Sequence, residues 1–360
     1  MQGRFCESED MHRGVIYALL AAAFFGASTP FAKALLGEVH PIVLAGLLYA
    51  GSGIGLAIVQ IFRVSFVRKA EPVAWPSRRD WAWLAAAIFF GGILGPVLLM
   101  YGLATTAASS TSLLLNLESA FTALLAWFLF RENFDRRIAW GMAALFAGGV
   151  VLSVGPGNIG GVSRGALLVA GACLCWAIDN NLTRKVSASD AILIAGLKGL
   201  VSGGVNLSLA LSLGYAMPGL GRIGEAAAVG FFGYGVSLAL FVLALRHLGT
   251  ARTGAYFAIA PFYGGILAVL FFGDAVTVQL CIAAALMAVG LWLHLSEHHE
   301  HQHTHEEVKH THSHRHDAHH QHAHDFEWNG MEPHNHPHRH AATIHRHAHF
   351  PDIHHRHRHG

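Results

Sequence analysis

Charged residues are scarce in this chain: Asp, Glu, Lys and Arg together make up 13% of its 360 residues. A soluble globular domain carries about 25%, so the deficit excludes an ordinary soluble protein. Hydrophobic residues make up 53% of the chain. Because the residues after Leu295 are polar, the part before them is more apolar than this average, and we place that part in lipid.

The sequence also has no nucleophile motif, no phosphate-binding loop and no ATPase signature. We therefore expect neither an enzyme nor an ATP-driven pump, so energy would come from an ion gradient or from exchange. The four cysteines do not form a disulfide framework or a zinc ribbon. No cleavable signal peptide is evident, because the first apolar run, 14–36, is long enough to span a membrane.

The apolar part divides into segments of the length needed for transmembrane helices. A spanning helix needs roughly 20 mostly apolar residues, and these runs lack the alternation of barrel strands. The fold class expected is therefore an all-α integral membrane protein with ten transmembrane helices. They are expected at 14–36, 41–62, 81–103, 107–130, 137–155, 165–184, 191–213, 226–246, 250–272 and 276–295.

Lysine and arginine are distributed unequally between the two sets of connections. One set, with the N-terminal residues 1–13, carries 14 of them, and the other set carries 3. Because cytoplasmic loops are rich in Lys and Arg, both termini are expected in the cytoplasm of a multi-pass protein of the inner or plasma membrane. These cationic loops are explained by orientation, so we expect no nucleic-acid partner.

The two halves of the apolar part resemble each other. Residues 44–47 and 52–53 recur at 194–197 and 202–203, an offset of 150, and residues 111–132 align with 253–274 at an offset of 142. A repeat with an odd number of spans must insert upside down in its second copy, and inverted repeats are typical of secondary transporters. The domains expected are a first repeat at 14–155, a second at 164–295 and a polar tail at 296–360.

Two motifs of the first repeat resemble the EamA family of the drug/metabolite transporter superfamily. Residues 25–33, FGASTPFAK, are similar to the family's aromatic-glycine start with a basic residue at the far end. Residues 113–127, LLLNLESAFTALLAW, are similar to its L-E-P-x-F-T-A-L-L-A-W pattern, with Ser119 where proline is usual. The second repeat has Pro261 at that place and Ala260 where the acid would be. The resemblance implies a carrier, often an exporter of small metabolites.

Glu118 is the strongest single signal for a transport site. It lies near the middle of the fourth expected span, where an acid costs about 2.5–3.5 kcal/mol on insertion scales. A role in transport or proton coupling is one reading, and a helix–helix hydrogen bond by a protonated Glu118 is the other. Asn116 and Ser119 flank it, but residues one or two apart point to other sides of a helix.

A second polar group lies toward the cytoplasmic end of the sixth expected span. Asp179, Asn180 and Asn181 are consecutive there, and Lys198 lies within the seventh span. A pairing of Lys198 with Asp179 would lower the cost of both charges in the membrane. Such a pair could be structural, or it could act in gating or in binding a substrate.

The tail contains 24 of the 28 histidines, between His298 and His359. It has little apolar content, so we expect it to be disordered without ligand. Alternating H-x-H places two imidazoles on one side of an extended chain, and imidazole suits nickel, cobalt, zinc and copper. The metal-binding residues expected are His299, His301, His303, His305, His310, His312, His314, His316, His334, His336, His338, His340, His355, His357 and His359.

Three functions therefore remain open at this point. The first is an exporter of a small metabolite with an accessory tail, for which no cofactor is required. The second is an exporter of nickel, cobalt or zinc with the tail as cytoplasmic collector, and the third is a membrane-anchored metal store or sensor. Many imidazoles with pKa near 6.5 could also sense pH. The partners expected are the bilayer, a small-molecule or ion substrate and a metal at the tail, and a homodimer is compatible with the sequence.

Overall fold

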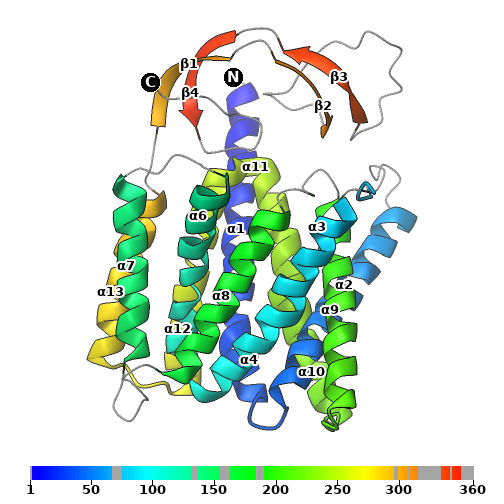
Figure 1. Cartoon of the computed structure of the whole chain (residues 1–360), viewed down its shortest axis with the longest axis vertical. Coiled ribbons are helices and arrows are strands. Elements are labelled where there is room, and N and C mark those ends of the chain that lie inside the picture. Colours follow the sequence, from blue (N-terminus) through cyan, green and yellow to red (C-terminus); the bar gives the residue numbers. More distant parts are fainter. Residues whose placement is uncertain are drawn as a thin grey trace.

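The protein is a bundle of long helices (Figure 1). The computed structural model describes residues 2–66, 75–78, 80–130, 136–154, 163–183, 186 and 190–295, and for 299–305, 308–314, 334–340 and 343–349 it describes the backbone alone. The helices of the first half are α1 (Gln2–Leu35), α2 (Pro41–Phe66), α3 (Asp80–Ala87), η1 (Ile88–Leu94), α4 (Gly95–Thr105), α5 (Ala108–Leu114), α6 (Leu117–Phe130) and α7 (Arg136–Ser153). Those of the second half are α8 (Arg164–Thr183), α9 (Ala191–Ser212), α10 (Leu220–Gly230), η4 (Phe231–Val236), α11 (Ser237–Phe257), α12 (Ala260–Phe272) and α13 (Val278–Leu295).

Seven helical stretches among the described residues are long and apolar enough to cross a membrane. The protein is therefore a multi-pass membrane protein with an all-helical membrane part. The stretches are Met11–Leu35, Pro41–Arg63, Asp80–Thr105, Arg164–Thr183, Ile192–Ser212, Leu220–Ala244 and Thr253–Phe272. The other three expected spans coincide with α5 and α6, with α7, and with α13, whose apolar part is Val278–Leu293.

Four of the expected spans are not continuous α-helices, a detail that the sequence analysis did not predict. The helix expected at 107–130 is interrupted by a turn at Leu115 and Asn116, and the helix expected at 250–272 is interrupted at Ala258 and Ile259. The spans expected at 81–103 and 226–246 contain the π-helices η1 and η4. Each of these irregularities in the first half has a counterpart in the second, about 142 residues later.

Two expected boundaries also differ in the structure. Helix α1 begins at Gln2, so residues before 14 continue the helix instead of forming a separate segment. Helix α11 continues through the connection expected between 246 and 250, where no proline interrupts it. A continuing helix satisfies the backbone N–H and C=O groups of these residues internally, whereas a loop would leave them to bind water.

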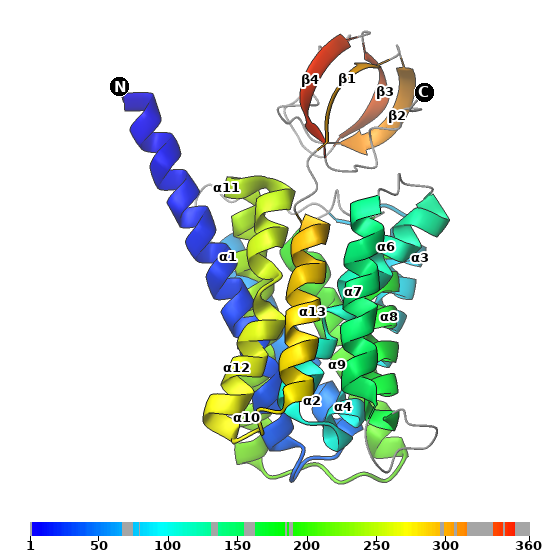
Figure 2. The same cartoon turned by 90° about the vertical axis from the view of Figure 1, so that its left-hand side faces the viewer.

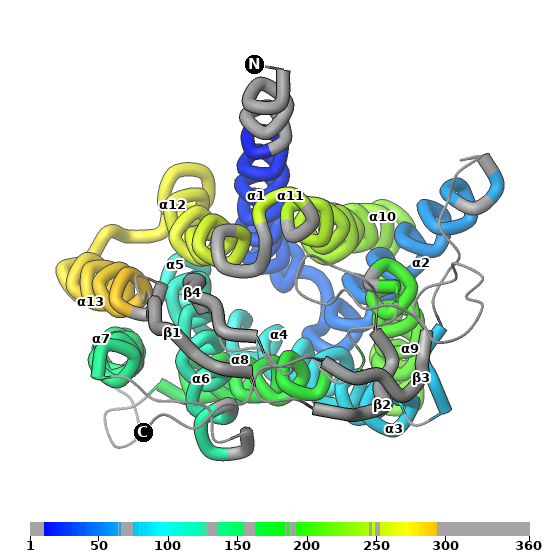
Figure 3. The backbone as a smooth tube through the Cα atoms, turned by 90° about the horizontal axis from the view of Figure 1, so that it is seen from above, coloured from blue at the N-terminus to red at the C-terminus, as the bar shows by residue number. Residues whose placement is uncertain are grey.

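Close helix pairs form the two flanks of the bundle, as the view from above shows (Figure 3). One flank is α2 with α9, and the other is α7 with α13. Both pairs depend on glycine, because a Cβ on Gly53 would lie 2.3 Å from the Leu200 nitrogen and one on Gly148 would lie 2.7 Å from Met287 Cγ. Small residues at such places let helix backbones approach closely in lipid.

The first residue of α1 and the last residue of α13 lie at the same end of the bundle (Figure 2). We call this the terminal end and the opposite end the far end. The tail that follows α13 contains four strands, β1 (His299–His305), β2 (Val308–His314), β3 (His334–His340) and β4 (Thr343–His349). Strand β1 pairs antiparallel with β4, and β2 with β3. β-Branched residues, which favour strands, occur in β2 (Val308 and Thr311) and in β4 (Thr343 and Ile344).

Candidate functional site

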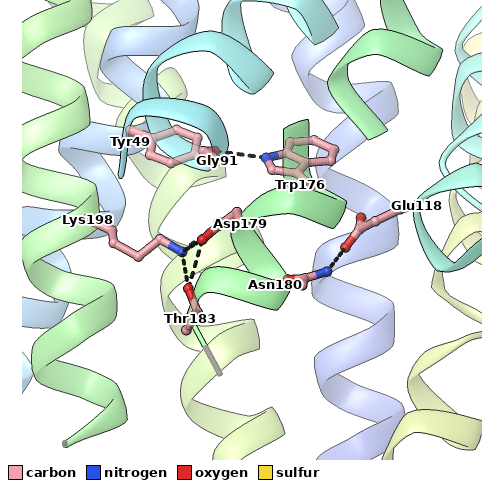
Figure 4. Close-up of polar contacts among 8 residues, drawn as sticks. All are labelled: Tyr49, Gly91, Glu118, Trp176, Asp179, Asn180, Thr183 and Lys198. Atoms are coloured by element: carbon pink, nitrogen blue, oxygen red, sulfur yellow. Dashed lines mark hydrogen bonds and ion pairs between the residues drawn. The ribbon is translucent and has the colours of Figure 1, made fainter. Parts of the chain in front are cut away.

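The polar residues of the membrane part gather around helix α8. Asp179 and Asn180 are neighbours on α8, and their side chains point to different partners (Figure 4). Asp179 meets Lys198 of α9, and Asn180 meets Glu118 of α6. Helix α8 thus contacts both Glu118 and Lys198, which the sequence placed in two different spans.

Asp179 and Lys198 form a buried ion pair. The Lys198 Nζ atom lies 2.6 Å from both carboxylate oxygens of Asp179. Thr183, one turn after Asp179 on α8, donates its hydroxyl to the same carboxylate at 2.8 Å. The side chain of Asp179 is 9% exposed and that of Lys198 18%, so this is the paired arrangement that intramembrane charges require.

Glu118 has a different environment from Asp179. It lies in the first turn of α6, directly after the helix break, where the helix dipole favours a negative charge. Its Oε1 atom accepts a hydrogen bond of 2.8 Å from the Asn180 amide. Among the described residues it has no Lys or Arg partner in an ion pair, although Asp179 and Lys198 both lie within electrostatic reach of it. Glu118 can therefore bind a proton or another positive group.

Exposure changes along the face of α8 that carries Asn180. Asn180 is exposed and Glu118 is half-buried. The residues one and two turns before Asn180 on the same helix face, Cys173, Trp176 and Ala177, are buried. This face of α8 is therefore buried over most of its length and becomes exposed toward the terminal end of the bundle.

The π-helix η1 is attached to three neighbouring helices beside this site. The Gly91 carbonyl accepts hydrogen bonds of 2.9 Å from Tyr49 of α2 and from the indole of Trp176 of α8. The Gly92 carbonyl accepts one of 3.2 Å from Asn206 of α9. π-Helices are rare and frequently occur at functional sites. Here the carbonyls of η1 accept hydrogen bonds from side chains within the protein, as polar backbone in a membrane must.

Glycine at position 91 leaves the space that Asp179 occupies. A Cβ on Gly91 would lie 1.9 Å from Asp179 Oδ2. In the second half, a Cβ on Gly233 of η4 would lie 2.5 Å from the Cβ of Ser28 on α1. Ser28 precedes Asp179 by 151 residues, close to the offset of 150 between the repeats. A similar contact therefore occurs in both halves, with an acid in one and a serine in the other.

The structure places the other candidate residues away from the Glu118 carboxylate. Asn116 is buried and donates to the Leu113 carbonyl at 2.9 Å, with the Met287 sulfur at 3.9 Å. Ser119 donates to the Asn116 carbonyl at 2.9 Å. Both therefore stabilise the helix break before Glu118. Sequence reasoning missed Thr183, although its position four residues after Asp179 was a usable signal.

No group of three or more His, Cys, Asp or Glu that could hold a metal ion occurs among the residues whose side chains the structure describes. Of the histidines expected to bind metal, His316, His355, His357 and His359 lie outside the described residues. The others lie on β1 to β4, where the backbone alone is described.

Comparison with known proteins decides the family. The model of the EamA-like transporter family matches the chain twice, at residues 12–154 and 163–296. The chain belongs to the EamA-like transporter family. The two matches cover the helices from α1 to α7 and from α8 to α13, so this EamA protein carries two copies of the family's unit.

Two relatives bear the word transporter in their names. An "Uncharacterized transporter" of Methanothermobacter thermautotrophicus is 29% identical over 294 residues, which cover 78% of this chain and 85% of the relative. The "Uncharacterized transporter YyaM" of Bacillus subtilis is 24% identical over 296 residues, which cover 78% of this chain and 93% of the relative. A solved structure titled "Crystal structure of protein" has the same fold, with a TM-score of 0.56 at 18% identity over 78% of this chain and 94% of that one. This EamA protein is thus a membrane transporter by family.

Proposed function

We propose that this protein is a secondary transporter that exports a small organic metabolite, and that Glu118 with Asn180 binds the proton or cationic group on which transport depends. The observation that carries the proposal is the position of Glu118. It lies in mid-span, in the first turn of a broken helix, without a basic partner among the described residues. Transporters often bind ions and substrates at discontinuous helices near the middle of the membrane.

The proposed architecture is ten crossings in two inverted five-helix repeats. Contacts between the halves support it, because they occur in pairs related by the sequence offsets. Gly53 packs on Leu200 and Gly203 on Ala50, and 50 and 53 correspond to 200 and 203. Gly148 packs on Met287 and Gly290 on Leu145, and 145 and 148 correspond to 287 and 290. The matching positions of η1 and η4 agree with the same symmetry.

The proposed orientation places both termini in the cytoplasm of the inner or plasma membrane. The excess of Lys and Arg in the connections at the terminal end supports it. In that orientation the exposed Asn180 lies toward the cytoplasm. A solute could then reach the Glu118–Asn180 pair from the side on which an exporter loads.

Replacement of Glu118 by glutamine tests the proposal in cells. Cells that produce the intact protein and cells that produce E118Q are grown on ¹³C-labelled glucose, and labelled solutes in the medium are measured by mass spectrometry. We expect the intact protein to raise one class of solute outside the cells. E118Q keeps the size and can still accept the Asn180 hydrogen bond, but it cannot exchange a proton, so it should abolish that rise.

The matched control is Glu225→Gln. Glu225 is an exposed acid of α10 that pairs with Arg222 at 2.6 Å, far from α8. It should export like the intact protein. Equal export by E118Q and the intact protein would contradict a role for Glu118, and no solute above the level of empty cells would contradict export.

A second candidate function is the export of nickel, cobalt or zinc, favoured by the 24 histidines of the tail. In the proposed orientation this tail lies on the loading side and would collect the metal. The membrane part would then bind the ion through oxygen atoms of Glu118 and Asp179, because it offers no histidine cluster among the described residues.

Cellular nickel, cobalt and zinc distinguish these functions when they are measured by elemental mass spectrometry. The strains compared produce the intact protein, a truncation after Leu295, or E118Q. If the protein exports metal, only the cells with the intact protein should contain less metal than empty cells. If it exports a metabolite, cells with the intact protein and cells with E118Q should contain equal amounts of metal. A rise with the intact protein and with E118Q, but not with the truncation, would identify a metal store.

A further inference from the structure

A clasp of charged side chains holds the turn between α4 and α5 at the far end of the bundle. This turn, at Thr106 and Ala107, joins the third and fourth helical segments of the chain. Lys33 of α1 donates to the carbonyls of Leu103 and Ala104, at 2.6 and 3.1 Å, at the end of α4. A lysine there satisfies carbonyls that lack partners within the helix and interacts favourably with its dipole.

The other side of the same turn is held by Asp274, which follows α12. Its Oδ2 atom accepts a hydrogen bond of 2.7 Å from the Ser109 backbone nitrogen, in the first turn of α5. Ala107, the residue that precedes α5, offers no side-chain cap of its own. The acid therefore replaces the missing cap and lies at the positive end of the helix dipole. Lys33 and Asp274 also attract each other electrostatically.

The two helices that carry these charges pack together as a unit. A Cβ on Gly26 of α1 would lie 2.3 Å from the Ala260 carbonyl oxygen of α12, and one on Gly264 would lie 2.5 Å from the Gly26 oxygen. Near the far end the rings of Phe31 and Phe272 meet edge to face at 5.4 Å. Helices α1 and α12 thus hold the α4–α5 turn jointly, through hydrogen bonds at both of its ends.

We infer that Lys33 and Asp274 form a latch that closes the transport path at the far end of the bundle. The inference depends on the proposed transport function. In this structure Asn180 is exposed, whereas Ala108, Ser109 and Ser112 beside the latched turn are buried. Opening toward the far end requires α4 and α5 to separate from α1 and α12, and the bonds of Lys33 and Asp274 are the polar contacts that this movement breaks.

Cysteine accessibility tests the latch in the full-length protein. The four native cysteines are replaced by serine, and Ser112→Cys is introduced as the reporter. Ser112 is 1% exposed on α5, and its hydroxyl lies 2.9 Å from the place of a Cβ on Gly264 of α12. Right-side-out vesicles are treated with a membrane-impermeant maleimide. We expect K33Q or D274N to raise the rate of labelling about tenfold, as expected for loss of a charge-assisted hydrogen bond.

Two controls make the outcome specific. R222Q removes the ion pairs of Arg222 with Glu38 and Glu225 at the same end, neither of which includes a residue of the α4–α5 turn, and should leave labelling unchanged. K33R keeps a donor for the carbonyls and should label like the parent. Labelling in K33Q and D274N at the rate of R222Q would overturn the latch. The assay needs no substrate, so failure of the proposed export would appear in the solute measurement and leave this result interpretable.

Discussion

At the scale of single residues, the carboxylate of Asp179 depends on the absence of a side chain at position 91. Alanine at Gly91 would place a Cβ 1.9 Å from Asp179 Oδ2 and 2.3 Å from its Cγ. We expect G91A to displace Asp179 from Lys198 and to lower stability by about 1–3 kcal/mol, the usual cost of overpacking. Thermal unfolding of the purified protein in detergent measures this change.

Gly204→Ala is the matched control for G91A. Gly204 lies within α9, and a Cβ there would meet no described heavy atom within 4 Å. Since alanine favours a helix over glycine by about 0.5–1 kcal/mol, G204A should keep or slightly raise the melting temperature. A loss in G204A as large as in G91A would contradict the explanation by contact with Asp179.

The Asp179–Lys198 pair predicts a strong coupling between two substitutions. Removal of one partner leaves an unpaired buried charge, which costs about 3–5 kcal/mol. We expect D179N and K198M each to destabilise the protein strongly, and the double variant to recover most of the loss, because no charge then lacks a partner. Thermal unfolding of the intact protein, the two single variants and the double variant measures the coupling free energy between the two positions. Additive losses would show that the charges do not act as a pair.

At the scale of secondary structure elements, Asp190 fixes the start of α9. Its Oδ1 atom accepts hydrogen bonds of 3.0 Å from the backbone nitrogens of Ile192 and Leu193, and its Oδ2 atom lies 2.6 Å from Arg63 at the end of α2. Burial alone would raise the pKa of Asp190, but the hydrogen bonds from Arg63 and from these two nitrogens outweigh it, so the pKa is lowered.

This shift predicts how stability depends on pH. A lowered pKa means that the stabilisation by Asp190 is present above its ordinary pKa of about 3.9 and is lost as the pH falls through the lower value of the folded protein. Asp190→Asn keeps a capping oxygen but loses the charge. We expect D190N to be less stable by about 1–2 kcal/mol at pH 7, with a difference that shrinks at acid pH. A difference that stays constant down to about pH 3 would contradict the assignment.

The elements also show which parts of the fold could be predicted from the sequence. Length and hydropathy predicted the positions of the helices well. They did not predict the break before Glu118, because Leu115 and Asn116 include neither proline nor glycine. Pro261 at the start of α12 follows the equivalent break directly, so the proline was a usable signal in the second half. The π-helices η1 and η4 were missed since an altered hydrogen-bond pattern leaves the hydropathy of a segment unchanged.

At the scale of the whole molecule, the candidate site could be predicted only in part. The cost of a charge in lipid indicated Glu118, Asp179 and Lys198 from the sequence, and it also indicated that two of them would pair. The partnership of Glu118 with Asn180 follows from how α6 packs on α8, which no local pattern encodes. The clasp of Lys33 and Asp274 likewise joins residues 241 positions apart in the sequence, so no local pattern indicates it.

The packing of the whole bundle explains why Asp179 is paired with a lysine and why Glu118 has no such partner among the described residues. Asp179 is held by Lys198 and Thr183, so it has the contacts of a fixed structural group. Among the described residues, Glu118 has one hydrogen-bond partner that carries no charge, the amide of Asn180. In the proposed mechanism, closure of the far end by Lys33 and Asp274 would be one state of a carrier that is loaded from the terminal end.

The most direct measurement is solute efflux from proteoliposomes, because no other cellular protein takes part. Purified protein is reconstituted into vesicles loaded with a ¹³C-labelled metabolite extract, a pH gradient is imposed, and labelled solutes outside are identified by mass spectrometry over time. Vesicles with the intact protein and with E225Q should release one class of solute faster than empty vesicles, and vesicles with E118Q should not. Equal release by E118Q and the intact protein, or release no faster than from empty vesicles, would contradict the account.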